Sequence, residues 1–250
     1  SVSPEKQIYY CFGCGAGGNV IKFLMEMEQL SFVEAVRRLA EEAAIPLPRM
    51  GTFSDPEDGP RKRMREALDW ACRLYHHILL NTDQGRDAFR YLQERGVSME
   101  TIKEFRLGYA PSSGNILLRF LKRKGFSEKL QAEAGLLSTS ESATAPLRYF
   151  DRFRGRVMFP IHDSQGRIIA FGGRLLGEGH PKYLNSPETP LFHKGKHLFN
   201  LHRARKAIRR ERQVVLFEGY MDVISAWQAG IQTGVASLGT SLSEDQARTI

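Results

Sequence analysis

The stretch VVLFEGYMDVISAWQAGI, residues 214–231, decides the fold of the C-terminal part of the chain. Its first four residues are apolar and run without interruption up to Glu218 and Gly219, a pattern typical of a short parallel strand buried on both faces. The apolar residues that follow are spaced as in an amphipathic helix. A second apolar run, VASL at 235–238, precedes a segment in which Ser243 and Gln246 form a capping box for another helix. The order strand, helix, strand, helix predicts a parallel sheet with a right-handed crossover, in which ligands bind outside the carboxyl ends of the strands.

Glu218 stands at that carboxyl end. One interpretation is that it only favours the positive N-terminus of the helix that follows. Asp222 supports a second interpretation, because it lies four residues later in the first turn of the helix, close enough to share a cation with Glu218. Two carboxylates at a strand end are hard oxygen ligands of the kind that Mg²⁺ prefers, and next to a basic segment they indicate a phosphate substrate.

Basic residues are concentrated in one part of the chain. The 250 residues carry a formal net charge of +8. Residues 151–210 hold 13 Lys and Arg against 4 Asp and Glu, whereas the rest of the chain holds 23 basic and 24 acidic residues. The basic residues of this segment alternate with aromatic residues and glycines, which suits contacts to phosphates and stacked bases. A solvated basic face is the alternative explanation.

The composition is that of an ordinary soluble globular protein, with 42% hydrophobic and 26% charged residues. No apolar run approaches the ~20 residues needed to span a bilayer, and the first residues lack the features of a signal peptide. We therefore expect a cytoplasmic protein without a membrane partner.

Cys11 and Cys14 form a Cys-x-x-Cys pair within a glycine-rich segment. Two thiolates at this spacing can bind one zinc ion at ~2.3 Å. A closed structural site needs four ligands, and no second pair stands nearby, so a redox pair or two incidental cysteines are alternatives. Cys72 falls in a helical pattern, where we expect a small, partly buried residue and no ligand. His76 and His77 are adjacent and cannot share one helix face, so we expect no metal there.

Periodicity and turn residues divide the rest of the chain. Two short helices are predicted over 20–39, the second beginning at a capping box of Ser31 and Glu34 and stopped by Pro46 and Pro48. Pro, Gly and Asp without periodicity predict a linker over 49–60. Beyond the linker, apolar spacing predicts helices over 61–81, 88–95, 99–105 and 116–124. A low-complexity surface loop is predicted over 140–146, and a hairpin over 156–176 that turns at 163–166 and has a bulge or a close backbone approach at Gly172 and Gly173.

Three parts of the sequence resemble one known family in the family's order. EGYMDVISAWQAGI with VASLGTSL resembles the toprim motif. RFRGRVMFPIHDSQGRIIAFGGR and PKYLNSPETPLFHKGKHLF resemble the polymerase domain of bacterial DnaG-type primases, and YYCFGCGAGGNVIKFLMEME resembles the second half of the zinc-binding domain of these enzymes. The resemblance implies an α+β polymerase subdomain over 61–210, the first part of an α/β toprim subdomain with parallel strands over 211–250, and a small zinc-ribbon-like remnant over 1–48.

The resemblance also implies an activity and its residues. The family comprises DNA-dependent RNA polymerases that use Mg²⁺ or Mn²⁺ to join ribonucleoside triphosphates into short primers on single-stranded DNA. By position, Glu218 matches the catalytic metal-binding glutamate, Asp222 the acidic residue that ends the motif, and Cys11 and Cys14 the last two of four zinc ligands. The basic groove that binds template and nucleotide is matched by Arg106, Arg154, Arg156, Arg174, Lys182, Tyr183, Asn185 and Lys194.

The sequence also departs from the family pattern. The first two zinc ligands of the family would lie before Ser1, and its later Asp-Gly-Asp motif would follow Ile250. We therefore expect an internal fragment of a monomeric bacterial primase, inactive alone, whose full-length form binds Zn²⁺ and is recruited to replication forks at the nucleoid by the replicative helicase through a missing C-terminal region. A toprim-type nuclease or topoisomerase and a catalytically incomplete module that only binds single-stranded nucleic acid are the alternatives.

Overall fold

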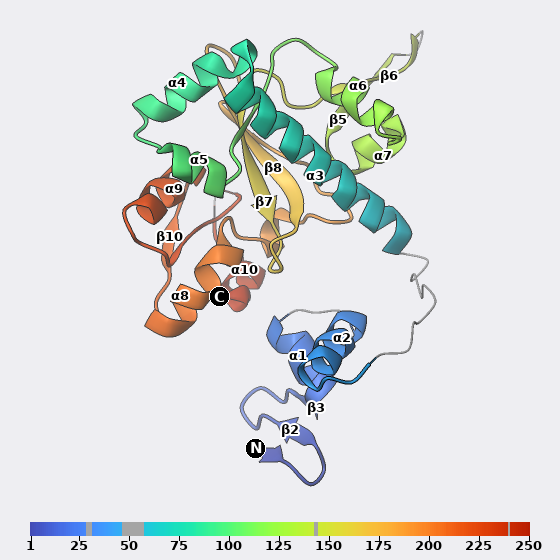
Figure 1. Cartoon of the computed structure of the whole chain (residues 1–250), viewed down its shortest axis with the longest axis vertical. Coiled ribbons are helices and arrows are strands. Elements are labelled where there is room, and N and C mark those ends of the chain that lie inside the picture. The colour runs from blue at the N-terminus through green and yellow to red at the C-terminus, as the bar shows by residue number, and fades with distance from the viewer. Residues whose placement is uncertain (29–31, 47–57, 143–144, 240) are drawn as a thin grey trace. The chain divides into compact units, whose positions relative to one another are not determined.

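The computed structural model of the chain describes residues 1–28, 32–46, 58–142, 145–239 and 241–250 (Figure 1). The chain forms two compact units, Ser1–Asp55 and Pro56–Ile250. The predicted capping box, which needs Ser31 and the side chain of Glu34, and the stop at Pro48 cannot be compared with the described residues, and most of the predicted linker lies outside them. Residues 58–60, which the sequence assigned to the linker, form the beginning of a helix.

The N-terminal unit contains a small antiparallel sheet and two helices. The sheet has the order β1-β2-β3, with β1 at Val2–Ser3, β2 at Ile8–Tyr10 and β3 at Gly17–Asn19. The helices are α1 (Val20–Glu28) and α2 (Phe32–Glu42), which agree with the predicted pair. The side chain of Asn19 accepts a hydrogen bond of 2.9 Å from the backbone N–H of Lys22, which fixes the beginning of α1.

The second unit is built around a four-stranded antiparallel sheet. Its strand order is β4-β7-β8-β9, with β4 at Gly108–Ala110, β7 at Arg156–His162, β8 at Ile168–Leu175 and β9 at Tyr183–Asn185. Every residue of β7 and the first six of β8 are buried, so the predicted hairpin is the centre of the core. Hydrophobic residues of β4, β7, β8 and several helices belong to one buried cluster.

Helix α3 (Asp58–Asn81) lies against this sheet, as Figure 1 shows, and packs most closely at Gly108. A Cβ atom added to Gly108 would come within 2.6 Å of the Cβ of Tyr75, so only glycine allows the contact. Cys72 of α3 is 1% exposed, so it is more deeply buried than predicted, and burial raises the pKa of its thiol to about 12. Across the described ranges, no helix combines the length and the apolar character needed to cross a bilayer.

Four shorter helices follow α3: α4 (Arg86–Glu94), α5 (Met99–Glu104), α6 (Ile116–Arg123) and α7 (Glu128–Glu133). The first three agree with the prediction to within two residues at each end. Helix α7 was missed, although with six residues it is as long as α5, which was predicted. Its local signal is Ser127, whose hydroxyl accepts the backbone N–H of Leu130 at 3.3 Å.

The predicted surface loop over 140–146 is wrong for its described residues. They belong to a two-stranded antiparallel ribbon of β5 (Leu137–Ser142) and β6 (Ala145–Asp151). Serine, threonine and alanine in this segment gave a low-complexity pattern rather than an apolar alternation, so the strands had no hydrophobic signature. Asp151 ends β6 and accepts the backbone N–H groups of Leu117 and Leu118, both at 2.9 Å, which ties the ribbon to the start of α6.

From Val215 onward the chain has the predicted order of strand, helix, strand and helix, whereas the helix at Leu201–Glu211 was not predicted. The C-terminal part comprises α8 (Leu201–Glu211), β10 (Val215–Phe217), α9 (Tyr220–Gln228), β11 (Gly234–Ala236) and α10 (Glu244–Thr249). Strands β10 and β11 are parallel, and the capping box of Ser243 and Gln246 is present. The prediction that β10 is buried on both faces is wrong, because Leu216 is 45% exposed. Within the described residues, β10 pairs with β11 alone, so part of its surface stays open to solvent.

Candidate functional site

Two carboxylates lie at the carboxyl end of the parallel strand pair. Glu218 directly follows β10, and Asp222 lies in the first turn of α9. Both residues are exposed. A Cβ atom added to Gly219 would lie 2.9 Å from Oδ2 of Asp222, so the Asp222 carboxylate folds back over the backbone that carries Glu218. The strand and the helix therefore present two carboxylates at the edge where parallel sheets bind ligands.

The chemistry of this pair fits a hard divalent cation. Oxygen ligands from exposed carboxylates suit Mg²⁺, which retains several waters and is bound through one or two protein carboxylates. Across the described part of the chain, no group of three or more His, Cys, Asp or Glu residues is placed to hold a metal. Glu218 and Asp222 can therefore supply two of the ligands of such an ion, and substrate phosphates or water are suited to the other positions.

The basic segment meets this edge at Asn185. The Tyr220 hydroxyl donates to Oδ1 of Asn185 at 2.6 Å, and Nδ2 of Asn185 donates to the carbonyl of Leu238 at 2.9 Å. Tyr220 lies two residues after Glu218, and Leu238 lies two residues after the end of β11. One side chain of β9 thus connects to the carboxyl ends of both parallel strands.

Arg174 and Tyr183 are neighbours on the sheet. They are paired residues of β8 and β9, and the Arg174 guanidinium carbon lies 4.1 Å from the ring centroid of Tyr91 in α4. Tyr183 is 44% exposed, and Lys182 beside it is exposed. A cation and an aromatic ring side by side provide the two contact types that single-stranded nucleic acid uses. Tyr91 was missed by the sequence, since nothing in its helix signals a contact to a strand 83 residues later.

Arg156 lies beneath this surface. It is 6% exposed, and its guanidinium donates to the backbone carbonyls of Gly173, Pro181 and Lys182 at 2.9–3.3 Å. Burial lowers the pKa of Arg156. These contacts hold the segment that presents Lys182, so the structure gives Arg156 a supporting position; a direct contact to nucleic acid stays a prediction.

The turn around Lys194 is held by two other elements. Glu188 accepts the backbone N–H of Lys194 at 3.0 Å, and this bond holds the pKa of Glu188 below its ordinary value. Gln246 of α10 donates to the carbonyls of Lys194 and His197, both at 2.8 Å. The backbone of Lys194 is therefore fixed from both sides. Glu188 and Gln246 were not among the predicted site residues.

Two predicted groove residues have separate surroundings. The Arg106 guanidinium pairs with Asp69 of α3 at 3.2 Å, and its backbone has a φ of 49° in the left-handed region. Arg154 is exposed, and its guanidinium carbon lies 5.2 Å from the ring centroid of Phe150. Neither of these contacts involves Arg174 or Tyr183, so the assignment of Arg106 and Arg154 to the same groove stays a prediction.

Cys11 and Cys14 lie in a tight turn after β2. The backbone N–H of Gly15 donates to the Cys11 carbonyl at 2.9 Å, and Gly15 has a φ of 74°, which favours glycine. Backbone N–H groups of Cys14 and Gly13 directed at the Cys11 sulfur lower the pKa of its thiol. Both cysteines are exposed and free. The turn therefore suits two thiolate ligands of a zinc ion, but it contributes only two donors.

We expect this 250-residue chain to bind zinc below one equivalent and to lose it readily. A tetrahedral structural site requires four ligands, and affinity falls steeply with an incomplete set. Elemental analysis after dialysis against EDTA measures the retained metal, and Cys72→Ala serves as a control that removes a thiol outside the turn. One zinc retained per chain would contradict the expectation and would mean that two further ligands exist.

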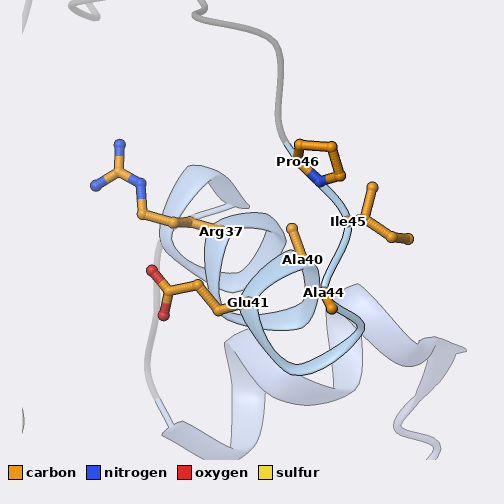
Figure 2. Close-up of a pocket in the computed structure, with 6 residues that line it drawn as sticks. All are labelled: Arg37, Ala40, Glu41, Ala44, Ile45 and Pro46. Atoms are coloured by element: carbon orange, nitrogen blue, oxygen red, sulfur yellow. The ribbon is translucent and has the colours of Figure 1, made fainter.

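A shallow hollow of about 600 Å³ lies beside α2 in the N-terminal unit (Figure 2). It is lined by Arg37, Ala40, Glu41, Ala44, Ile45 and Pro46. The Arg37 and Glu41 side chains extend from one face of the helix, and the other lining residues are apolar. None of these residues belongs to the predicted site, and the hollow contains no pair of metal-ligating side chains.

Known proteins match every part of this arrangement. Residues 1–54 match the CHC2 zinc finger, residues 75–205 the DNA primase catalytic core, N-terminal domain, and residues 215–250 a Toprim-like family. A DNA primase of Geobacillus stearothermophilus is 49% identical over 254 residues, and one of Pseudomonas putida is 47% identical over 255 residues. The matches cover 100% of this chain and 42% and 38% of these relatives, so the chain spans about two fifths of their length.

Solved structures show the same fold. The zinc-binding and RNA polymerase domains of Aquifex aeolicus primase have a TM-score of 0.67 and 37% identity, covering 99% of this chain and 58% of that one. A DnaG primase catalytic domain bound to single-stranded DNA has a TM-score of 0.68 and 40% identity, covering 76% of this chain and 58% of that one. Because the catalytic-core family matches residues 75–205, which are more than half of the chain, the chain belongs to the bacterial DnaG-type DNA primases.

Proposed function

We propose that this chain is part of an enzyme that synthesises short RNA primers on single-stranded DNA by metal-assisted nucleotidyl transfer. The observation that supports this most directly is the hydrogen bond that Tyr220 donates to Asn185, which brings a basic, aromatic sheet edge to the two carboxylates at the carboxyl end of β10. A phosphate-bearing substrate needs positive charge along its backbone and an oxygen-ligated cation at the reacting phosphate. This edge has basic side chains for the phosphates and two carboxylates that can hold such a cation.

Each group has a defined task in the proposal. Glu218 and Asp222 hold and orient a divalent cation, which when bound stabilises negative charge on the transferred phosphoryl group. Arg174, Lys182 and Lys194 contact phosphates of the template or the nucleotide, and Tyr183 offers a ring for a base. Arg106 and Arg154 extend the basic surface, while Arg156 and Asn185 support it from within. Most of the catalytic effect then comes from positioning and electrostatics, as is general for phosphoryl transfer.

The same proposal implies the substrates, the metal ions and the cellular location of the protein. The substrates are ribonucleoside triphosphates and single-stranded DNA, with Mg²⁺ or Mn²⁺ at the carboxylates and Zn²⁺ at Cys11 and Cys14. The protein acts as a monomer in the bacterial cytoplasm, at replication forks, beside the replicative helicase. Residues 1–48, 61–210 and 211–250 correspond to the zinc-binding, polymerase and toprim parts, with 49–60 between the first two. Incorporation of labelled ribonucleotides by a form that continues beyond Ile250 tests the activity, and absence of any RNA product would contradict it.

The 250-residue chain should bind single-stranded DNA with an affinity that falls as salt rises. Each phosphate that a Lys or Arg neutralises adds about −0.7 to the slope of log K against log salt concentration. Replacing Arg174, Lys182 and Lys194 together by Ala should therefore flatten that slope by roughly 2 units. Fluorescence anisotropy with a labelled oligonucleotide, measured across a range of KCl concentrations, gives the slope.

The matched control removes the same charge elsewhere. Lys62, Arg86 and Lys129 are exposed and lie on α3, α4 and α7. Their triple Ala variant has the same net charge as the test variant and should keep the original slope. Equal slopes for both variants would assign Arg174, Lys182 and Lys194 to an ordinary solvated face, and a thermal melt identifies any variant that is unfolded.

A further inference from the structure

Three residues of the central sheet form one row across neighbouring strands. Phe159 of β7 pairs with Gly172 of β8, and Gly172 pairs with Asn185 of β9. Paired residues of adjacent strands present their side chains on the same face of a sheet. The row therefore consists of an aromatic ring, a position without a side chain, and an amide.

Tyr220 lies along this row and contacts each member. Its ring is stacked on Phe159, with ring centroids 5.0 Å apart and planes inclined by 6°. A Cβ atom on Gly172 would come within 2.5 Å of the end of the Tyr220 ring, so the ring occupies the space that a side chain there would fill. Its hydroxyl then donates to Asn185 at 2.6 Å. The ring of Phe199 also packs edge to face against the Tyr220 ring, with the ring centroids 4.9 Å apart.

Tyr220 lies in the turn that carries the two carboxylates. The residue is midway between Glu218 and Asp222, and it is 7% exposed although both carboxylates are exposed. It is thus the anchored residue of the turn that carries them. The same Asn185 also donates to Leu238, beyond the end of the second parallel strand, at 2.9 Å. Both strand ends are consequently held to one amide of the nucleic-acid-binding sheet.

We infer that Tyr220 is a positioning residue, whose hydrogen bond to Asn185 sets where Glu218 and Asp222 stand relative to the basic surface of the β8–β9 edge. This inference rests on the proposed function. A phenylalanine would fill the same volume and keep the stack on Phe159, so packing alone does not require the hydroxyl. The bond fixes the rotation of the carboxylate turn over the sheet, and errors of about 1 Å in such placement can cost as much as a hundredfold in rate.

The test is Tyr220→Phe in a form of the protein that continues beyond Ile250. We expect kcat for ribonucleotide incorporation to fall by roughly tenfold, since one buried hydrogen bond is lost while the ring remains. Binding of Mn²⁺ alone, followed by its electron paramagnetic resonance signal, should weaken in the same variant. The dissociation constant for single-stranded DNA and the melting temperature should stay close to those of the unaltered protein.

Tyr75→Phe is the matched control. Tyr75 is 2% exposed and lies in the same core, edge to face with Phe171, and its hydroxyl has no hydrogen-bond partner among the described residues. It should leave kcat and Mn²⁺ binding unchanged. Equal kcat for Tyr220→Phe and Tyr75→Phe would overturn the inference, as would a Tyr220→Phe variant that loses activity only in proportion to a loss of folded protein.

A double-mutant cycle separates positioning from general damage. Asn185→Ala removes both hydrogen bonds of the Asn185 side chain. Adding Tyr220→Phe to this variant should therefore lower kcat by less than twofold further. If the two substitutions instead lower kcat by the product of their separate effects, Tyr220 and Asn185 do not act through their shared hydrogen bond. Glu218→Gln in the same form distinguishes the two proposals. If Glu218→Gln is inactive and Tyr220→Phe is normal, only the positioning inference fails; if both are normal, the proposed function fails as well.

Discussion

Glu218→Gln lowers primer synthesis by at least about a hundredfold in a form of the protein that continues beyond Ile250, the expected scale of losing one preorganised electrostatic contact. Glutamine has nearly the size of glutamate but no charge, so it holds a divalent cation poorly. Glu218 is exposed at the end of β10, and its loss removes no packing from the core. Folding and template binding should therefore persist. Incorporation of labelled ribonucleotides with Mg²⁺ or Mn²⁺, beside a single-stranded DNA titration, measures both quantities.

Glu244→Gln is the control that tests the competing explanation of Glu218. Glu244 is an exposed glutamate in the first turn of α10, where it favours the positive end of the helix but does not follow a strand. If Glu218 served only its helix, the two variants would behave alike and both would make primers. Loss of DNA binding together with loss of synthesis in Glu218→Gln would instead indicate misfolding.

The sequence was sufficient for several elements whose signal is local, although α7 and the β5–β6 ribbon, which are local as well, were missed. The order of β10, α9, β11 and α10, the capping box at Ser243 and the Cys11–Cys14 turn each depend on residues within a few positions of one another. The hairpin of β7 and β8 was also predictable, because its apolar runs flank a turn. Such patterns follow from backbone geometry and capping, which act over short separations in the chain.

What the sequence could not provide depends on strand register and on packing between distant segments. Asn185 and Tyr220 lie 35 residues apart and meet only because β7, β8 and β9 align Phe159, Gly172 and Asn185. The close approach predicted at Gly172 is confirmed, but its partner was not identifiable. The burial of Arg156 and the exposure of Leu216 were not predictable for the same reason, because each depends on which elements cover a strand.

Two histidines provide a second large expected effect, on stability. His162 ends β7 and is 7% exposed, and its ring centroid lies 4.2 Å from that of His202 in α8. Burial lowers the pKa of His162 to about 3 and that of His202 to about 2, and the positive charge of Arg203 nearby acts in the same direction on both. Both rings are therefore neutral in the folded protein at any pH near neutrality.

The free energy of unfolding should consequently fall as the pH is lowered from 7 to 5. In the unfolded chain each imidazole has a pKa near 6.5, so the unfolded state binds more protons than the folded state below that pH. The stability from the neutral rings is fully present above about pH 6.5 and is lost progressively as the pH falls toward the folded pKa values. At pH 5 the loss for the buried His162 is about 2 kcal/mol.

Urea unfolding at pH 7 and pH 5 measures this loss, and tryptophan fluorescence reports it from one unit. The chain has two tryptophans, Trp70 and Trp227, and both lie in the Pro56–Ile250 unit. His162→Gln should have a smaller difference in unfolding free energy between the two pH values, whatever its absolute stability, because one of the two buried histidines that take up protons on unfolding is gone. His180→Gln, at an exposed position, should retain the full difference.

Asp151, whose pKa is raised by burial, works in the opposite direction, but it is common to all three proteins and cancels in the comparison. An unchanged difference in His162→Gln would show that His162 is protonated equally in both states and does not contribute to acid sensitivity.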